Sequence, residues 1–307
     1  MTRVLVVGGS GMLGHRLVLE LAGRPGLDVH ATVRHPVPGP FRAAGAVYHE
    51  GIDLSAGTAL VARVLADLRP DIVINAVGAI KQKDLATNID QTYFLNGTLP
   101  HALASLNPNA AARVIHVSTD CVFQGDRGGY RQDETPDATD LYGRSKAVGE
   151  LNYGGHLTLR TSIVGFELGG HLGLVSWFFK QPTGSRVHGY VNARYSGVTT
   201  GELSRTIAAA IVGNAPANGM WHVASEPISK FDLLSRINTA FALGHTLVPE
   251  EALRIDRTLN DAPWREATGT TRPSWDALVK DLQADWRDRP YAAVYSGSAP
   301  TAGARTA

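Results

Sequence analysis

The sequence predicts an α/β fold, in which a doubly wound parallel sheet is joined to a smaller C-terminal subdomain. Through the first half of the chain, short apolar runs alternate with longer amphipathic stretches. The apolar runs are nearly continuous in Val, Ile and Leu, which is typical of parallel strands covered by helices on both faces. A glycine-rich segment between Gly8 and Gly14 joins the first run to the first amphipathic stretch, as in sheets that bind ligands at their carboxyl edge.

The expected elements follow one another in strict order up to about residue 164. Strands are expected at residues 3–7, 29–33, 47–52, 71–77, 114–117 and 157–163. Helices are expected at residues 12–22, 58–68, 88–106 and 141–151. Beyond this point the alternation is less regular, and helical spacing returns at residues 201–212, 230–242 and 275–287. This order predicts a Rossmann-type sheet that later segments help to complete.

Composition limits the classes of partner and compartment. The 307 residues are 44% hydrophobic and 19% charged, with a formal net charge of +1. Without a basic stripe, nucleic acid is not expected as a partner. No apolar run approaches the roughly 20 residues of a membrane span, so no membrane association is expected. The single cysteine excludes a disulfide framework and a cysteine-rich metal site, and it favours a cytoplasmic location.

The segment V-L-V-V-G-G-S-G-M-L-G-H-R-L carries the phosphate-binding signal. Gly8, Gly11 and Gly14 lie between a strand and a helix, where glycines let the backbone approach a pyrophosphate closely. The first helical turn then offers free N–H groups and a partial positive charge. Ser10, Met12 and Leu13 share this loop and are expected to contact the cofactor. The alternative is a tight turn without a ligand, and the absence of a P-loop lysine disfavours nucleotide hydrolysis.

Arg34 follows the second expected strand and indicates which cofactor is bound. An acidic residue at this place would accept hydrogen bonds from a ribose 2′-hydroxyl, whereas an arginine can pair with a 2′-phosphate. NADP(H) is therefore expected in preference to NAD(H). The alternative is a solvated surface arginine.

Two further strand ends are expected to line the cofactor. Asp53 and Leu54 follow the third strand and could face the adenine, although Asp53 is equally suited to cap a helix. Asn75, Ala76 and Val77 end the fourth strand with small side chains, which leaves room for a cofactor to cross it.

The candidate catalytic residues are Thr119, Tyr142 and Lys146. Tyr142 and Lys146 stand four residues apart on an expected helix, so they share one face. An adjacent ammonium is expected to lower the pKa of a phenol, which suits it to proton transfer at a carbonyl or alcohol. Thr119 follows the fifth strand and could hydrogen-bond the substrate oxygen. The alternative for the isolated Tyr-x-x-x-Lys pair is two residues on the surface of a helix. The alternative for Thr119 is a hydroxyl that bonds the local backbone in a turn.

Together these segments resemble the extended short-chain dehydrogenase/reductase family. The matching stretches are V-V-G-G-S-G-M-L-G, D-L at 53–54, N-A-V-G at 75–78, N-G-T-L-P-H-A-L-A from Asn96, S-T-D-C-V-F and Y-G-R-S-K. Within the family, the chain most resembles dTDP-4-dehydrorhamnose reductase and related 4-keto-6-deoxyhexose reductases, on D-E-T-P-D-A-T-D-L-Y-G-R-S-K and R-T-S-I-V-G. The resemblance implies NADPH-dependent reduction of a nucleotide-linked 4-keto-6-deoxy sugar, with Thr119, Tyr142 and Lys146 carrying the chemistry.

Cys121 separates this chain from two related subfamilies. Nucleotide-sugar dehydratases carry a glutamate at this position, so its absence argues against water elimination. In GDP-fucose synthase a cysteine at the same spacing acts with a histidine in epimerisation, and His171 lies near the expected place of that histidine. An epimerase or epimerase-reductase that uses Cys121 is therefore an alternative. We favour a packed thiol, because a thiol needs a nearby cation to become a useful base.

The substrate is expected to contact the second half of the chain. Arginines and aromatic residues in V-H-G-Y-V-N-A-R-Y suit a nucleotide diphosphate and its base. The expected substrate-binding residues are Thr119, Asp120, Cys121, His171, Trp177, Asn192, Arg194 and Arg257.

The organisation implied is an NADP-binding Rossmann domain at 1–164, an interleaved substrate-binding subdomain at 165–290 and a disordered tail at 291–307. A homodimer is a possible state, because paired helices often join subunits in this family. A second functional alternative is a non-catalytic NADP-binding regulatory protein, which would be expected to tolerate losses among Thr119, Tyr142 and Lys146.

Overall fold

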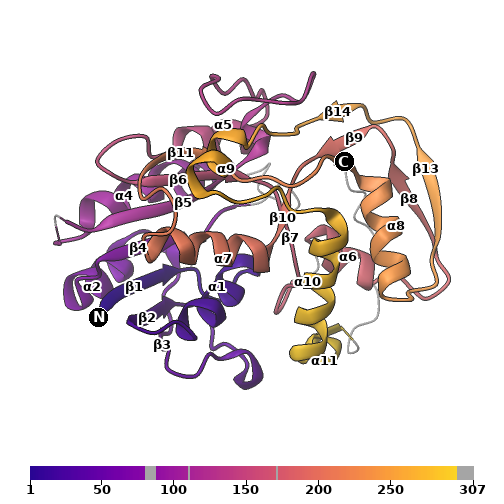
Figure 1. Ribbon diagram of the computed structural model, residues 1–307. Helices are drawn as coiled ribbons and strands as arrows, with labels where there is room; N and C mark the ends of the chain where they lie inside the picture. Colours follow the sequence, from indigo (N-terminus) through magenta and orange to yellow (C-terminus); the bar gives the residue numbers. More distant parts are fainter. Residues whose placement is uncertain (80–87, 110, 171, 296–307) are drawn as a thin grey trace.

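A computed structural model describes residues 1–79, 88–109, 111–170 and 172–295. At its centre lies a seven-stranded sheet in the order β11-β6-β5-β4-β1-β2-β3, in which all neighbouring strands are parallel (Figure 1). Its strands are β1 (Thr2–Val7), β2 (Leu27–Thr32), β3 (Val47–His49), β4 (Ile72–Asn75), β5 (Arg113–Thr119), β6 (Leu157–Thr161) and β11 (Gly219–His222). The predicted α/β class is confirmed, and β11 from the second half of the chain completes the sheet.

Helices cover both faces of this sheet. They include α1 (Met12–Ala22), α2 (Ala59–Leu68), α4 (Leu99–Leu106) and α7 (Thr200–Ile211). Val4 and Val6 of β1 lie in one buried cluster with α1 and α7, while Leu5 and Val7 lie in another with α2 and α4. Because successive strand residues point to opposite faces, the unbroken V-L-V-V run follows from burial on both sides.

The expected helix at 88–106 contains a wide turn. It consists of α3 (Ile89–Tyr93), the π-helical turn η4 (Phe94–Thr98) and α4. Asn96 in η4 is fully buried; its Oδ1 accepts the Ala79 N–H at 2.8 Å, and its Nδ2 donates to the Ser145 hydroxyl at 3.0 Å. The wide turn therefore fastens this helix both to the segment after β4 and to α5 (Leu141–Val148).

The second half of the chain adds a helical layer and several short strands beside the sheet. The helices are α6 (Leu174–Phe179), α8 (Lys230–Ala240), α9 (Ala262–Thr268) and α10 (Trp275–Asp288). The strands are β7 (Ile163–Val164), β8 (Arg186–Tyr190), β9 (Ala193–Tyr195), β10 (Val198–Thr199), β12 (Ile228–Ser229), β13 (Thr246–Glu250) and β14 (Ile255–Asp256). Helices α6, α8 and α10 lie beside the sheet in Figure 1. They share a second hydrophobic cluster, which also includes Val33, Val37 and Phe41.

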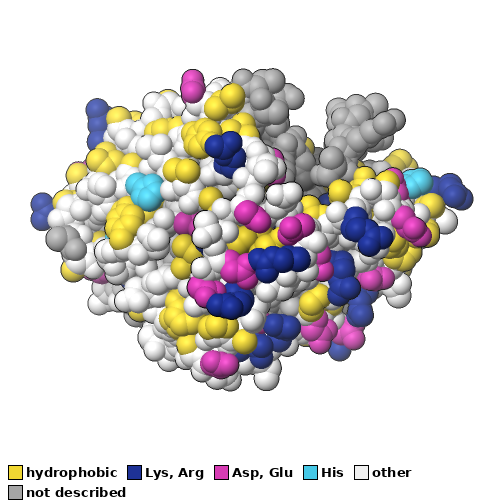
Figure 2. All heavy atoms as spheres, turned by 90° about the horizontal axis from the view of Figure 1, so that it is seen from above, with side chains coloured by type: hydrophobic (Ala, Val, Ile, Leu, Met, Phe, Trp, Pro, Cys, Tyr) yellow, Lys and Arg dark blue, Asp and Glu magenta, His cyan; other side chains and the backbone are white. Residues whose placement is uncertain are grey.

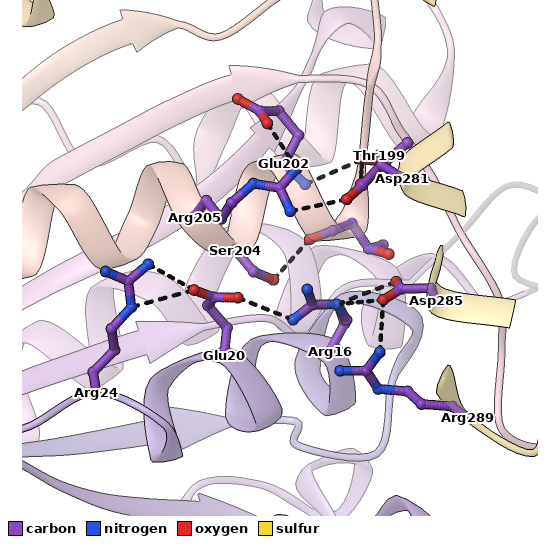
Figure 3. Close-up of polar contacts among 11 residues, drawn as sticks. Arg16, Glu20, Arg24, Thr199, Glu202, Ser204, Arg205, Asp281, Asp285 and Arg289 are labelled. Carbon is purple, nitrogen blue, oxygen red and sulfur yellow. Dashed lines mark hydrogen bonds and ion pairs between the residues drawn. The ribbon is translucent and has the colours of Figure 1, made fainter. Parts of the chain in front are cut away.

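Buried ion pairs join α1, the helix after the glycine loop, to α10. The Arg16 guanidinium lies 3.0 Å from the Asp285 carboxylate, and both side chains are almost fully buried. Glu20 and Arg289 extend this network at either end (Figure 3). Breaking such a pair would leave an uncompensated buried charge, so the network fixes how α10 sits against α1.

The expectation of disorder from residue 291 needs correction at its start. Tyr291–Tyr295 forms a short helix, α11, and the Tyr291 side chain is only 1% exposed. Its hydroxyl lies 2.7 Å from His15 Nε2, and its ring packs against Phe41 and Phe166. The aromatic residues of Y-A-A-V-Y supply apolar area that outweighs the small, polar composition of the tail. Residues 296–307 lie outside the described part.

Charge and hydropathy on the described residues agree with the composition. On the face shown in Figure 2, basic and acidic side chains alternate rather than gather by sign. Among the helices of the described ranges, none combines the length and the apolar character that crossing a bilayer requires.

Candidate active site

The glycine loop connects β1 to α1 and is held from the neighbouring strand. Thr32 at the end of β2 accepts the Gly8 N–H through its hydroxyl at 3.2 Å and the Gly9 N–H through its carbonyl at 2.9 Å. A Cβ on Gly14 would lie 2.0 Å from the Gly8 carbonyl oxygen, so only glycine allows α1 to start this close to the loop. Gly11 is the N-cap of α1 and is exposed, which leaves the first helical turn open to an anion.

The other predicted loop residues divide by burial. Ser10 and Met12 are half-buried, so both can reach a ligand. Leu13 is 5% exposed and lies in the core cluster of α1, so only its backbone can contribute. The sequence alone could not distinguish a residue that reaches a ligand from one that packs in the core, because Ser10, Met12 and Leu13 all stand where the loop passes into the helix.

Arg34 and Asp53 lie near each other, just beyond the ends of β2 and β3. Arg34 is exposed just beyond β2, and its charge helps to hold the pKa of Asp53 below its usual value. The larger cause is hydrogen bonding: Asp53 accepts the Ser55 hydroxyl at 2.7 Å and the Ser55 N–H at 2.9 Å. Asp53 is thus the N-cap of the short 3₁₀ helix η2 (Leu54–Ala56), as its alternative interpretation predicted, and Leu54 is buried.

The Asn75 side chain is buried and bonded within the protein. It is fully buried, and its Oδ1 accepts the Val77 N–H at 3.1 Å while its Nδ2 lies 3.2 Å from His116 Nδ1. Ala76 and Val77 are half-buried beside the glycine loop. The segment can therefore face a cofactor through its backbone and these small side chains.

Thr119 and Tyr142 are brought together at the carboxyl edge of the sheet. Thr119 ends β5, its hydroxyl caps the 3₁₀ helix η5 (Asp120–Val122) by accepting the Cys121 N–H at 3.1 Å, and a side-chain hydrogen bond joins it to Tyr142. Asp140 caps α5 by accepting the Gly143 N–H at 2.9 Å. A Cβ on Gly143 would lie 2.2 Å from the Cys121 carbonyl oxygen, so glycine permits this close approach.

The pKa of Tyr142 differs from the sequence-based expectation. Burial raises the pKa of this phenol above its ordinary value, and Cys121 and Asp120, when ionised, add to the rise. The Thr119 hydrogen bond opposes it. The predicted lowering by Lys146 is therefore wrong for the described protein, because desolvation of the phenolate outweighs any attraction.

Lys146 is buried against β5. The residue is only 4% exposed, and its Nζ donates to the Val117 carbonyl oxygen at 2.7 Å. Nζ also lies 3.5 Å from His116 Nε2. Burial lowers the pKa of Lys146 to about 8, while the charge of Glu150 acts in the opposite direction. This amine is therefore poised near neutral pH, whereas an ordinary lysine stays protonated up to about pH 10.

Ser118 belongs to a buried ion pair and not to the reacting groups. Its hydroxyl donates to Glu150 at 2.7 Å, and Glu150 accepts two further bonds of 2.7 Å from Arg160 on β6. All three residues are at most 9% exposed. This arrangement fixes the start of R-T-S against β5. The strand-end hydroxyl that contacts Tyr142 is therefore that of Thr119, which also donates to Asp120 Oδ1 at 3.1 Å.

Asp120 and Cys121 follow directly in η5. Asp120 is 3% exposed, and burial raises the pKa of its carboxyl, opposed by the charge of Arg257. Cys121 is half-buried and close enough to affect both Asp120 and Tyr142. The hydroxyl of Tyr195, also beside Asp120, is buried and finds no hydrogen-bond partner within the described ranges.

The second half of the chain carries three more predicted residues on or beside β9 and β14, and one of them, Arg257, reaches Asp120. Parallel pairing of β9 with β14 sets Arg194 opposite Asp256, and their charged groups lie 3.8 Å apart. Arg257 donates to the Phe123 carbonyl oxygen at 2.8 Å, which ties β14 to the loop after η5. Asn192 is half-buried in the turn before β9. Arg257, the loosest of the motif matches, therefore lies beside Asp120.

The remaining two predicted residues are not brought into this cluster by any contact that we can describe. Trp177 is half-buried on α6 and packs at the edge of the second hydrophobic cluster, with its ring 6.3 Å from that of Phe178. His171 lies outside the described residues, so its predicted place beside Cys121 stays a prediction.

Several residues with polar contacts near the site were not identified from the sequence. Thr32 and His116 stand in strands that carry no motif at those positions, and Asn96 opens a stretch that matches the family but was not assigned to the site. The polarity of His116 inside the apolar run V-I-H-V could have signalled a role, because a buried strand residue with a titratable ring needs partners.

The chain is similar in sequence to a family of known proteins. The family described as RmlD substrate binding domain matches residues 1–285. The dTDP-4-dehydrorhamnose reductase of Mycobacterium tuberculosis is 32% identical over 155 residues, which cover 48% of this chain and 44% of that protein. The reductase of the same name from Aggregatibacter actinomycetemcomitans is 26% identical over 92% of this chain and 99% of its own. The predicted family resemblance is confirmed.

The extent of these matches differs. The chain spans less than half of the length of the first relatives it matches, 45%, 47% and 44%. The crystal structure of dTDP-4-dehydrorhamnose reductase from Bacillus anthracis in complex with NADP superposes with a TM-score of 0.75. It is 22% identical and covers 93% of this chain and 99% of that one, which shows a shared fold.

Proposed function

The chain belongs to the RmlD substrate binding domain family, and from that premise we propose that it is an NADPH-dependent reductase of a nucleotide-linked 4-keto-6-deoxy sugar. The single observation that carries the proposal is the meeting of Thr119, Tyr142 and Lys146 at the carboxyl edge of β5. This edge is where parallel sheets bind their ligands, and the glycine loop opens onto it from β1.

NADPH, when bound, supplies the hydride. The keto carbon of the sugar accepts it, and Tyr142 gives its phenolic proton to the oxygen that becomes the alcohol. A phenol whose pKa is raised by burial keeps its proton at neutral pH, which suits a donor in the direction of reduction. Thr119 hydrogen-bonds the same oxygen and orients it. Lys146 stands behind Tyr142, holds the cofactor ribose and returns a proton to the phenolate.

The cofactor is NADP(H) in this proposal, with Arg34 as its determinant. Arg34 is exposed beyond β2 and close to Asp53, at the strand end where a Rossmann-type sheet would bind the adenosine ribose. A guanidinium pairs with a phosphate through charge-assisted hydrogen bonds. The glycine loop and the open first turn of α1 suit the pyrophosphate.

The substrate lies between Asp120 and the β9–β14 segment. Asp120 and the Tyr195 hydroxyl, which has no hydrogen-bond partner among the described residues, are buried together and offer polar groups to the sugar. Arg194, which is exposed, and Arg257 offer positive charge to the diphosphate. Asn192 and Trp177 are assigned to the nucleotide side on the family resemblance.

A homodimer and a cytoplasmic location complete the proposal. Ile89 and Val148, on helices α3 and α5 that lie against each other, are 56% and 57% exposed, and Tyr153 nearby is 48% exposed. Large apolar groups exposed together suit a subunit interface. Light scattering after gel filtration tests the dimer, and a monomer at micromolar concentration would refute it.

Cell fractionation tests the cytoplasmic location, which the single cysteine supports.

The test of function is NADPH oxidation with a panel of nucleotide-linked 4-keto-6-deoxy sugars, with the 4-hydroxy products as controls. We expect oxidation stoichiometric with the formation of a deoxy-sugar product two mass units heavier. Deuterium uptake from solvent beside the ketone would instead support the epimerase alternative. Tight NADPH binding without turnover of any panel member would support the regulatory alternative and contradict the proposal.

A further inference from the structure

His116 lies in the middle of β5 with polar groups on both sides of its ring. It is fully buried and is the register partner of Asn75 on β4. Its Nδ1 lies 3.2 Å from Asn75 Nδ2, and its Nε2 lies 3.5 Å from Lys146 Nζ. For a neutral ring placed between an amide and the candidate catalytic amine, the hydrogen bonds to those two neighbours determine which ring nitrogen carries the proton.

The orientation of the Asn75 amide determines which ring nitrogen carries the proton. The Val77 N–H, which can only donate, lies 3.1 Å from Asn75 Oδ1, so the amide oxygen is committed to it. Asn75 therefore presents its NH₂ group to His116, and this group can only donate. Nδ1 must then be the acceptor, so the ring proton is on Nε2. That N–H points toward Lys146 Nζ.

We propose that His116 is a positioning residue of the reductase, whose Nε2–H faces Lys146 Nζ and favours the neutral amine over the ammonium. A neutral amine can accept this hydrogen bond with its lone pair while it donates one to Val117. An ammonium has no lone pair and would face the His116 proton with one of its own. The ammonium form of Lys146 therefore gives up its proton to a neighbouring group more readily than it would without His116.

The charges around the pair are consistent with this direction. Burial and the charge of Lys146 hold the pKa of His116 well below 6.5, with a smaller contribution from His101 on α4. The ring is therefore neutral at pH 7. Glu150 acts on Lys146 in the opposite sense, favouring the ammonium. Tyr142 on α5 is the neighbour that needs a proton after each reduction, and its own pKa is raised.

The first test addresses the tautomer and does not depend on the proposed function. In protein labelled with ¹⁵N at its histidine rings, the His116 signals are assigned by through-bond connection and by their loss in His116→Gln. We expect the Nε2–H tautomer at pH 7, with no titration between pH 6 and 8. An Nδ1–H tautomer or a charged ring would overturn the proposal, whether or not the protein is a reductase.

The second test rests on the proposed reductase activity and measures the pH dependence of kcat/KM and of NADPH binding. The wild-type protein should lose both above a midpoint near pH 8. In His116→Gln the side-chain oxygen can turn toward the ammonium, so the midpoint should rise by about one pH unit. His101→Gln, the matched control, should move it less than half as far. A lowered melting temperature with an unmoved midpoint would mark His116 as merely structural and overturn the proposal.

Discussion

Lys146 Nζ donates a 2.7 Å hydrogen bond to the carbonyl oxygen of Val117, so the side chain of one helix is fastened to the backbone of the central strand. Val117 lies two residues before Thr119, and Lys146 lies one helical turn after Tyr142. The contact therefore fixes the position of α5 relative to the end of β5. The geometry of the three candidate catalytic residues depends on it.

The depressed pKa of Lys146 makes stability depend on pH. The folded protein releases the Lys146 proton near pH 8, while the unfolded chain keeps it to about pH 10.4. The unfolded state binds more protons within this window, so the contribution of Lys146 to the free energy of unfolding rises with pH there. We expect Lys146→Met to lack that rise. Urea unfolding at pH 7.5 and 9.5 measures it; parallel pH profiles for both proteins would contradict the shift.

Arg34→Ala should weaken NADPH binding without affecting NADH. Losing a charge-assisted bond to the 2′-phosphate costs about 1.5–3 kcal/mol, or about 10- to 100-fold in Kd. Arg42→Ala is the matched control, because Arg42 is likewise exposed but its guanidinium is paired with Glu50. Fluorescence titration gives both constants. An equal loss for NADH would mean that Arg34 does not read the phosphate.

Gly143→Ala should impair catalysis through position alone. The added Cβ would meet the Cys121 carbonyl oxygen at 2.2 Å, so α5 must move away from η5 and carry Tyr142 with it. A misplacement of about 1 Å can cost about 10²-fold in kcat. Gly39→Ala, which meets no atom within 4 Å, is the control. Unchanged kcat in Gly143→Ala would show that the two segments move independently.

Tyr291→Phe should lower stability by about 1–3 kcal/mol, because it leaves the buried His15 Nε2 without its partner. Tyr153→Phe, at an exposed ring, should cost about 0.5 kcal/mol or less. Thermal unfolding compares the two. Equal, small effects would mean that α11 contributes little to the fold.

The parts of this fold that the sequence predicts are those whose signals lie within one short stretch of the chain. The strands β1, β2, β4 and β5 and helix α1 were found because burial on both faces leaves a continuous apolar run, and because the glycine loop marks the turn. The short strands β7 to β14 were not found individually. They pair across distant parts of the chain, and no periodicity records which segment will lie beside them.

The site divides in the same way. Thr119, Tyr142 and Lys146 stand in motifs, so sequence predicted their meeting, and Arg257 was placed by a loose match. The raised pKa of Tyr142 could not be foreseen, because it arises from burial rather than from the neighbouring lysine. The contact between the Asn75 amide and the His116 ring depends on how β4 and β5 are aligned, and a single sequence does not show that alignment.

The most direct test of the central claim is single-turnover NADPH oxidation by Tyr142→Phe at saturating nucleotide sugar. Phenylalanine keeps the ring but lacks the proton that the reduction requires, so the rate should fall by about 10²- to 10⁴-fold. The NADPH dissociation constant and the melting temperature should stay close to those of the wild-type protein. A variant that oxidises NADPH at the full rate would contradict the assignment of Tyr142 as the proton donor.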